Sequence, residues 1–118
     1  MGYESYVTDF DLTVENLPVS KNWAVAAETG DYAMDTLTYI LGLTVEDDKP
    51  IWFDTGQMNA GKAYHLVDDL KPFISAVGRY GGRVVGSFVL VGEQWDDIVR
   101  YSVEDEKVIM TTAKIVFD

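Results

Sequence analysis

The stretch KAYHLVDDLKPFISAV, residues 62–77, decides the fold of this chain. Its apolar side chains recur every three or four residues, a spacing that places them on one face of a helix. A face this continuous must be buried, so we expect a central amphipathic helix that ends at Gly78. The apolar stripe consists of Ala63, Leu66, Val67, Leu70, Phe73, Ile74 and Val77.

The sequence after this helix has the composition of β-strands. Segments 83–91, 98–103 and 107–117 are rich in Val, Ile, Phe, Tyr and Thr. Short polar turns separate them, which is typical of an antiparallel meander. The last turn, Glu104-Asp105-Glu106, lacks the glycine that a two-residue hairpin prefers. We therefore expect a longer or bulged loop at this point.

The N-terminal half begins with an alternating pattern over residues 6–14, which predicts a half-buried strand. Residues 32–41 carry one apolar helical face, with Asp31 as a candidate N-cap and Gly42 as the expected left-handed residue at the C-terminus. Residues 23–27 fit either a short strand or a helical turn, and the pattern does not separate the two.

The middle of the chain predicts two short extended segments, residues 43–46 and 50–53, on either side of an acidic turn. Residues 55–61 have loop composition. Together these elements predict an α+β fold in one domain, residues 1–118. We expect two layers: an antiparallel β-meander sheet packed by the central amphipathic helix and a shorter helix.

Composition and charge exclude several classes of function. Twenty acidic residues against nine basic ones give the 118-residue chain a formal charge of −11, which repels nucleic-acid phosphates and anionic lipids. The absence of cysteine excludes disulfides and thiolate chemistry. No apolar run is long enough to span a membrane. We expect a protein of the cytoplasm of a bacterial host cell that binds neither nucleic acid directly nor membrane.

Familiar catalytic motifs are missing. The one histidine, His65, precedes Asp68 and Asp69 by one helical turn, and a surface ion pair explains it better than a metal or catalytic site. The glycine-rich stretch 78–82 follows a helix and does not open one, so it offers no phosphate loop. No nucleophile elbow or zinc-protease helix is present. We therefore predict no catalytic residue, no cofactor and no metal site.

A resemblance is carried by the C-terminal half of the chain. The stretch AYHLVDDL from Ala63, the strand around Gly86, and the later residues Gly92-Glu93, Asp97, Arg100 and Val103 resemble a set of small uncharacterised proteins of actinobacteria and their phages. Residues 19–61 do not share the likeness, and Asp105-Glu106 replaces an Asp-Gly turn. Since that set has no assigned activity, the resemblance implies a phage or mobile-element setting and no particular chemistry.

Acidic turns and tryptophans are the candidate partner-binding features. The acids collect at three predicted turns. Trp95 lies in one of these turns and is the preferred aromatic anchor for a partner, and Trp23 and Trp52 also lie in or beside predicted loops. A plainer interpretation is that these acids lie in solvated turns and only keep the protein soluble. A carboxylate pair near Trp95 could also bind a cation or act in general acid-base catalysis. The candidate residues are Glu46, Asp47, Asp48, Glu93, Trp95, Asp96, Asp97, Glu104, Asp105 and Glu106.

These features favour a non-enzymatic, phage-derived binding protein that meets a basic protein partner through an acidic surface. The concrete hypothesis is an inhibitor of a host nucleic-acid-directed defence enzyme, of the anti-CRISPR or anti-restriction type, that mimics DNA. A structural or assembly protein that forms a homodimer through a sheet edge is the alternative. A small-ligand binding module is a third possibility and requires a deep pocket.

Overall fold

A computed structural model describes residues 6–54, 66–92 and 98–112 of the chain and has the α+β architecture predicted from the sequence. Within these ranges six strands and three α-helices follow one another, with a short 3-10 helix, Val19–Lys21, before the first α-helix. In chain order the elements are β1 (Tyr6–Glu15), α1 (Asn22–Thr29), α2 (Asp31–Leu41), β2 (Leu43–Glu46), β3 (Lys49–Phe53), α3 (Leu66–Arg79), β4 (Arg83–Val91), β5 (Ile98–Glu104) and β6 (Lys107–Thr112).

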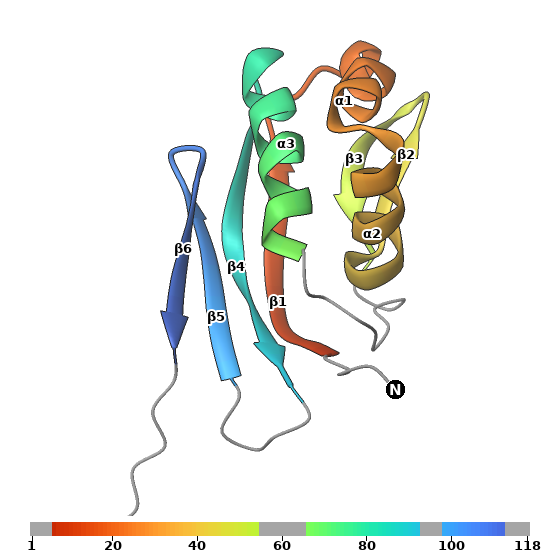
Figure 1. The fold of residues 1–118 in the computed structure, drawn as a ribbon. Helices are drawn as coiled ribbons and strands as arrows, with labels where there is room; N and C mark the ends of the chain where they lie inside the picture. The colour runs from red at the N-terminus through yellow and green to blue at the C-terminus, as the bar shows by residue number, and fades with distance from the viewer. Residues whose placement is uncertain (1–5, 55–65, 93–97, 113–118) are drawn as a thin grey trace, which may run out of the picture.

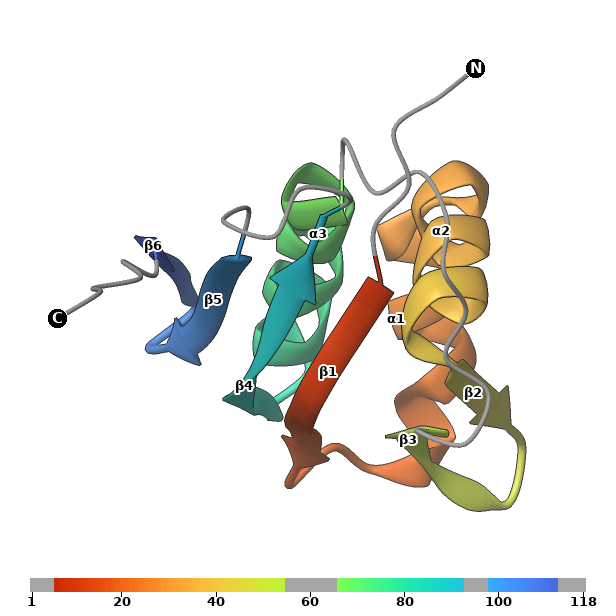
Figure 2. The same ribbon diagram turned by 90° about the horizontal axis from the view of Figure 1, so that it is seen from below.

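The main sheet has the strand order β1-β4-β5-β6, and all its neighbours are antiparallel. The predicted meander is therefore β4-β5-β6, and the N-terminal strand β1 joins its open side. Residues 113–117 of the predicted last strand lie outside the described residues. The hairpin β2–β3 forms a second, two-stranded sheet. Figures 1 and 2 show α3 lying over β4 on one face of the main sheet, with α1, α2 and the β2–β3 hairpin beyond β1.

A β-bulge in β1 changes the predicted side-chain alternation. The register passes from Thr8↔Val89 to Asp11↔Ser87, so β1 contains one extra residue at this point, and Asp9 adopts φ 49°. An extra residue reverses the facing of the side chains that precede it. Val7 is therefore buried, although the simple alternation places it on the face opposite to Leu12.

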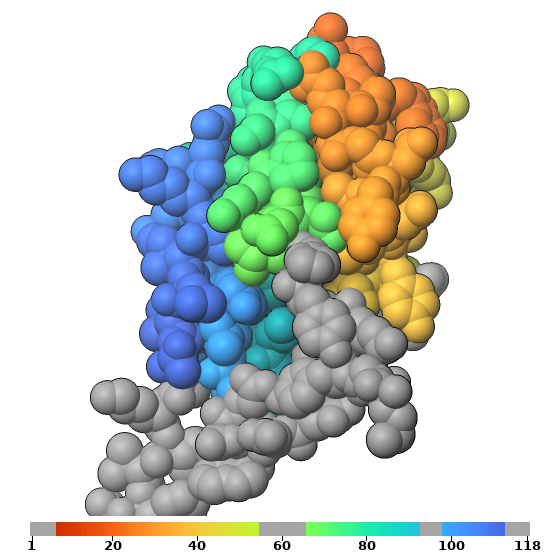
Figure 3. All heavy atoms as spheres, viewed as in Figure 1, coloured from red at the N-terminus to blue at the C-terminus, as the bar shows by residue number. Residues whose placement is uncertain are grey.

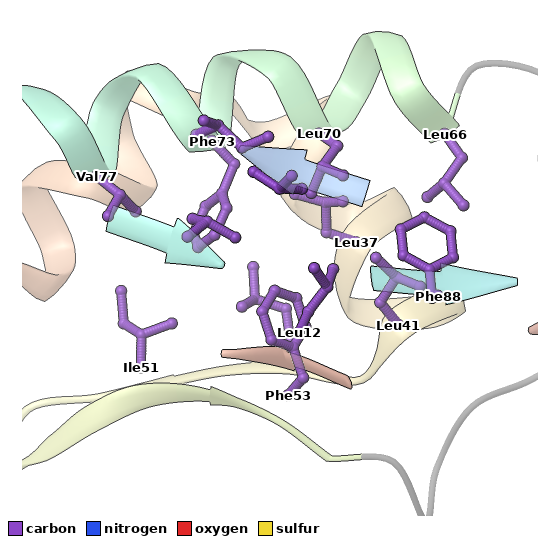
Figure 4. Close-up of a cluster of buried hydrophobic side chains, with 14 of the residues drawn as sticks. Leu12, Leu37, Leu41, Ile51, Phe53, Leu66, Leu70, Phe73, Val77 and Phe88 are labelled. Carbon is purple, nitrogen blue, oxygen red and sulfur yellow. The ribbon is translucent and has the colours of Figure 1, made fainter. Parts of the chain in front are cut away.

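The core lies between the sheet and the helices. The predicted stripe of α3 is its centre: Leu66, Leu70, Phe73, Ile74 and Val77 are all at most 1% exposed. Figure 4 shows the labelled side chains of α3 pointing toward Leu37 and Leu41 of α2, Phe88 of β4 and the β2–β3 hairpin. Neighbouring ring centroids, Phe53 with Phe73 and Phe88 with Tyr101, lie 6.1 and 5.4 Å apart, which is the usual aromatic packing distance.

Three local predictions need correction or completion. Residues 23–27 belong to the helix α1, which resolves the open choice there. Gly30 and not Asp31 is the N-cap of α2, because α1 ends at Thr29 and Gly30, at φ 96°, joins the two helices directly. Helix α3 continues past Gly78 to Arg79, and its predicted first turn, residues 62–65, lies outside the described residues.

The predicted loop at the last hairpin is also wrong. Glu104 pairs directly with Lys107, so only Asp105 and Glu106 form the turn. Both adopt left-handed φ angles, 49° and 66°, as a tight type I′ hairpin requires. The continuous β5–β6 register enforces this geometry without a glycine.

Among the helices within the described ranges, none has the length and apolar character needed to cross a membrane.

Candidate protein-binding surface

The segment from Asn22 to Asp48, which contains α1, α2 and β2, has no lysine or arginine. It carries six acids: Glu28, Asp31, Asp35, Glu46, Asp47 and Asp48. Lys21 and Lys49 bound it on either side. In Figure 3, α1 and α2 form an open surface beside α3. A fixed negative field over one part of the surface is the arrangement that attracts a basic partner.

The outer face of α2 carries two exposed tyrosines. Its inner face buries Ala33, Leu37, Ile40 and Leu41, and the residues between these must point away from the core. Tyr32 is 73% and Tyr39 57% exposed. They are seven positions apart, about two helical turns or roughly 10 Å, so they lie on the same side of the helix. Asp31 and Asp35 are exposed on this side too, and the α2 face is defined here as Asp31, Tyr32, Asp35 and Tyr39.

A third exposed aromatic side chain lies at the corner where α1 meets the β2–β3 turn. Trp23 is 57% exposed, and its indole Nε1 donates a hydrogen bond to Asp47 Oδ1. The preceding residue, Asn22, is fully buried, and its Nδ2 donates to the carbonyls of Glu46 at 2.5 Å and Lys49 at 2.7 Å. The start of α1 is thereby attached to both strands of the hairpin, which fixes the position of Trp23.

Glu28 is engaged within the protein and is less available to a partner. It accepts hydrogen bonds from Arg79 Nη1 at 3.0 Å and from the Tyr80 hydroxyl at 3.2 Å. Burial of the phenol, with the negative charge of Glu28 and this hydrogen bond, raises the pKa of Tyr80 above 10.0. The cluster connects α1 to the end of α3. By contrast, no ion pair to Asp31, Asp35 or Asp48 is found within the described part of the chain.

The predicted acidic turn Glu46-Asp47-Asp48 is the β2–β3 turn. Asp47 and Asp48 are exposed, while Glu46 pairs with Lys49 across the hairpin at 3.2 Å. Both partners of that ion pair are largely solvated, so it contributes little to stability. Of the three predicted residues, Asp48 therefore remains open to an external cation, while Asp47 is exposed but accepts the hydrogen bond from Trp23.

The predicted residues Glu104, Asp105 and Glu106 form the tip of the β5–β6 hairpin. The β4–β5 ladder ends at Gly86↔Val103, so the tip lies beside Arg83 and Val84 without pairing to them. A notch of about 690 Å³ opens there, lined by these acids and by Ser87 and Ser102. Figure 1 shows this tip and the β2–β3 turn at the same end of the molecule, on opposite sides of α3. The two acidic turns are therefore separate features.

Four predicted residues, Glu93, Trp95, Asp96 and Asp97, lie outside the described residues. The sequence interpretation missed Tyr32 and Tyr39. Their signal was present: both stand opposite the apolar positions of the predicted helix 32–41, at a spacing of seven residues and with an acid between them.

No group of three or more His, Asp or Glu side chains within the described ranges is close enough together to hold a metal ion. Comparison with protein-family models, curated proteins and solved structures finds no match for this chain.

Proposed function

We propose that this protein is a non-enzymatic binding protein that engages a basic protein partner through the α2 face. The observation that carries the proposal is the pair of exposed tyrosines, Tyr32 and Tyr39, in a 27-residue segment that has acids but no lysine or arginine. Tyrosine is enriched at binding hot spots because it contributes a large rigid surface with a polar end. The surrounding acids would steer a positively charged surface toward it.

The partner we favour is an enzyme that acts on nucleic acid. Such enzymes carry extended basic surfaces that normally neutralise phosphates, and those surfaces would meet the acidic segment. With the phage setting implied by the sequence resemblance, this gives an inhibitor of a host defence nuclease or CRISPR effector as the concrete form. The protein itself would bind no nucleic acid, since its charge of −11 has the same sign as the phosphates.

Photo-crosslinking from a single position tests the docking surface directly. A photoreactive phenylalanine analogue would replace Tyr32 and, as a control, the exposed Thr13 of β1, which belongs to another part of the molecule. Both proteins would be irradiated in bacterial lysate, and the adducts identified by mass spectrometry. We expect a basic protein to be captured from position 32 and not from position 13. Identical adducts from both positions would contradict the proposal.

Affinity measurements with the captured protein test the electrostatics. Asp35→Lys on the α2 face and Asp11→Lys on β1 change the net charge by the same amount, and both side chains are exposed. Tyr32→Ala and Asp35→Lys should each weaken binding by about 10- to 30-fold, while Asp11→Lys should have little effect. Binding should also weaken as salt increases. Equal losses from Asp35→Lys and Asp11→Lys would mean that net charge alone drives the association.

Competition with DNA tests the concrete form. If the captured partner acts on nucleic acid, wild-type protein should displace duplex DNA from it in an anisotropy assay, and Tyr32→Ala should displace it less well. A ternary complex with undiminished DNA binding would remove the mimic interpretation and leave the binding proposal standing.

A further inference from the structure

Among the strands of the described ranges, none pairs with the outer side of β6, which is the last strand of the main sheet. Five of the six residues of β6 are exposed, and it carries two large exposed hydrophobic side chains, Ile109 at 44% and Met110 at 63%. The opposite edge strand, β1, is different, because the β2–β3 hairpin lies beside it (Figure 2). Open edges present unpaired N–H and C=O groups to any other strand.

Natural proteins protect such edges with proline, bulges or inward charges. Strand β6 has none of these: its sequence KVIMTT contains no proline, and its register with β5 is continuous from Glu104↔Lys107 to Val99↔Thr112. Its one charge, Lys107, stands at the first position. Figure 1 shows helix α3 lying over β4, with β6 at the far edge of the sheet. Met110 of β6 is 63% exposed. The edge is therefore free of bulges and exposes two apolar side chains at its centre.

The tight turn determines which backbone groups are available. In a two-residue turn the carbonyl of the first strand residue accepts from the N–H three residues later, so the backbone of Lys107 bonds to Glu104 of β5. Along an antiparallel strand this direction alternates. Ile109 and Thr111 therefore also bond toward β5. Val108, Met110 and Thr112 present their N–H and C=O groups to the open edge.

We propose that a second copy of this chain pairs antiparallel with β6, with Met110 on the two-fold axis. In a symmetric pair outward-pointing residues must face outward-pointing ones, so the two-fold axis passes through a residue and not between two residues. We place it at Met110, which is 63% exposed. Met110 then faces Met110 of the partner subunit, and Val108 faces Thr112 of the partner subunit. The two main sheets become one continuous sheet of eight strands.

This register suits the composition of the strand. The Met110 side chains of the two copies would cover each other at the axis. The large exposed apolar side chains of β6 would therefore lie where the two strands meet. Lys107 lies away from the axis, so no like charges oppose one another within the described strand. The rest of the molecule repels its copy, because each carries a charge of −11. Screening by salt should therefore strengthen the dimer, whereas it weakens binding of a basic partner.

Cysteine cross-linking tests both the dimer and its register. The chain contains no cysteine, so a single substitution provides an unambiguous reporter. In Met110→Cys the two Cα atoms would be about 5.5 Å apart, within disulfide range. In the control Lys107→Cys the two positions would be roughly 20 Å apart. Mild oxidation should give a covalent dimer from Met110→Cys and almost none from Lys107→Cys. Equal cross-linking would overturn the proposal.

A proline substitution tests the hydrogen bonds. Met110→Pro removes an N–H that points to the partner and leaves the β5–β6 bonds in place, since edge strands tolerate proline on the outer side. Sedimentation of the wild type should show a species of twice 13.2 kDa that is favoured by salt. Met110→Pro should weaken it by about tenfold or more. Met110→Lys, which opposes two charges on the axis, should do the same if proline perturbs folding.

Three results would overturn the proposal: a wild-type monomer at all salt and protein concentrations, a dimer that survives both Met110→Pro and Met110→Lys, or Met110→Cys adducts formed only with another protein's strand. None of these concerns the α2 face. The dimer and the proposed function can therefore fail independently.

Discussion

Gly86→Ala should be among the most destabilising conservative substitutions in this protein. Gly86 adopts φ 117° in β4, at the place where the bulge of β1 brings the Asp11 carbonyl over it. A Cβ at this position would overlap the Asp11 oxygen and lie 3.1 Å from the Cα of Leu12. Both atoms belong to the backbone, so no side-chain rotation can relieve the overlap.

The expected loss has two parts. Holding alanine at this φ costs about 1–3 kcal/mol. Displacement of β1 would break about two hydrogen bonds of the β1–β4 ladder, each of which contributes about 0.5–1.5 kcal/mol. The sum, about 2–6 kcal/mol, is a large fraction of the 5–15 kcal/mol that stabilises a typical domain.

Gly81→Ala is the matched control. Gly81 also has a positive φ, 93°, but an added Cβ would meet no atom within 4 Å. Only the conformational cost applies to it, about 1–3 kcal/mol. Urea unfolding of both variants should give Gly86→Ala the larger loss, by about 1–3 kcal/mol, with unchanged denaturant slopes. Equal losses would refute the argument that the close approach of β1 requires glycine.

Two further substitutions test the packing around α1. Asn22→Ala removes two hydrogen bonds that a fully buried side chain donates to carbonyls of the hairpin. Urea unfolding should show that the free energy of unfolding falls by about 2–4 kcal/mol. A fall below about 0.5 kcal/mol would mean that water replaces the amide. Tyr80→Phe tests the raised pKa of the Tyr80 phenol. The folded state holds the phenol proton more tightly than the unfolded state does, so the wild type should lose stability as pH rises above about 10. Stability curves across this range should fall less steeply for Tyr80→Phe, and parallel curves would contradict the assignment.

Most of the secondary structure could be predicted because it follows from local periodicity. The stripe of α3, the apolar face of α2 with Gly42 at its end, and the three meander strands each repeat at the spacing of the element they form. The bulge in β1 could not be predicted, because it depends on the meeting of Asp11 with Gly86, far apart in the sequence. The tight turn at Asp105-Glu106 opposes local preference and is imposed by the β5–β6 register.

The candidate site was predictable only in part. The acidic turns at residues 46–48 and 104–106 were expected from the sequence and are turns. Their separation by α3 depends on how the β2–β3 hairpin packs beyond β1, which no local pattern encodes. From the sequence alone, Tyr32 and Tyr39 could be either buried or exposed. The structure shows that the opposite side of α2 is buried in the core, which leaves both tyrosines exposed. Their exposure makes them candidates for partner binding.

The positions of the two proposed surfaces make them compatible. Helix α2 lies beyond β1, and β6 is at the other edge of the sheet (Figure 2). A dimer formed through β6 would therefore place its two α2 faces at opposite ends of the joined sheet. This keeps the segments that lack basic residues apart, well beyond the screening length of about 8 Å at physiological salt, which reduces the repulsion between copies. It also gives the assembly two binding faces. A partner with two basic sites, or a dimeric partner, would be held more tightly by the dimer than by the monomer, because the second contact forms at high effective concentration.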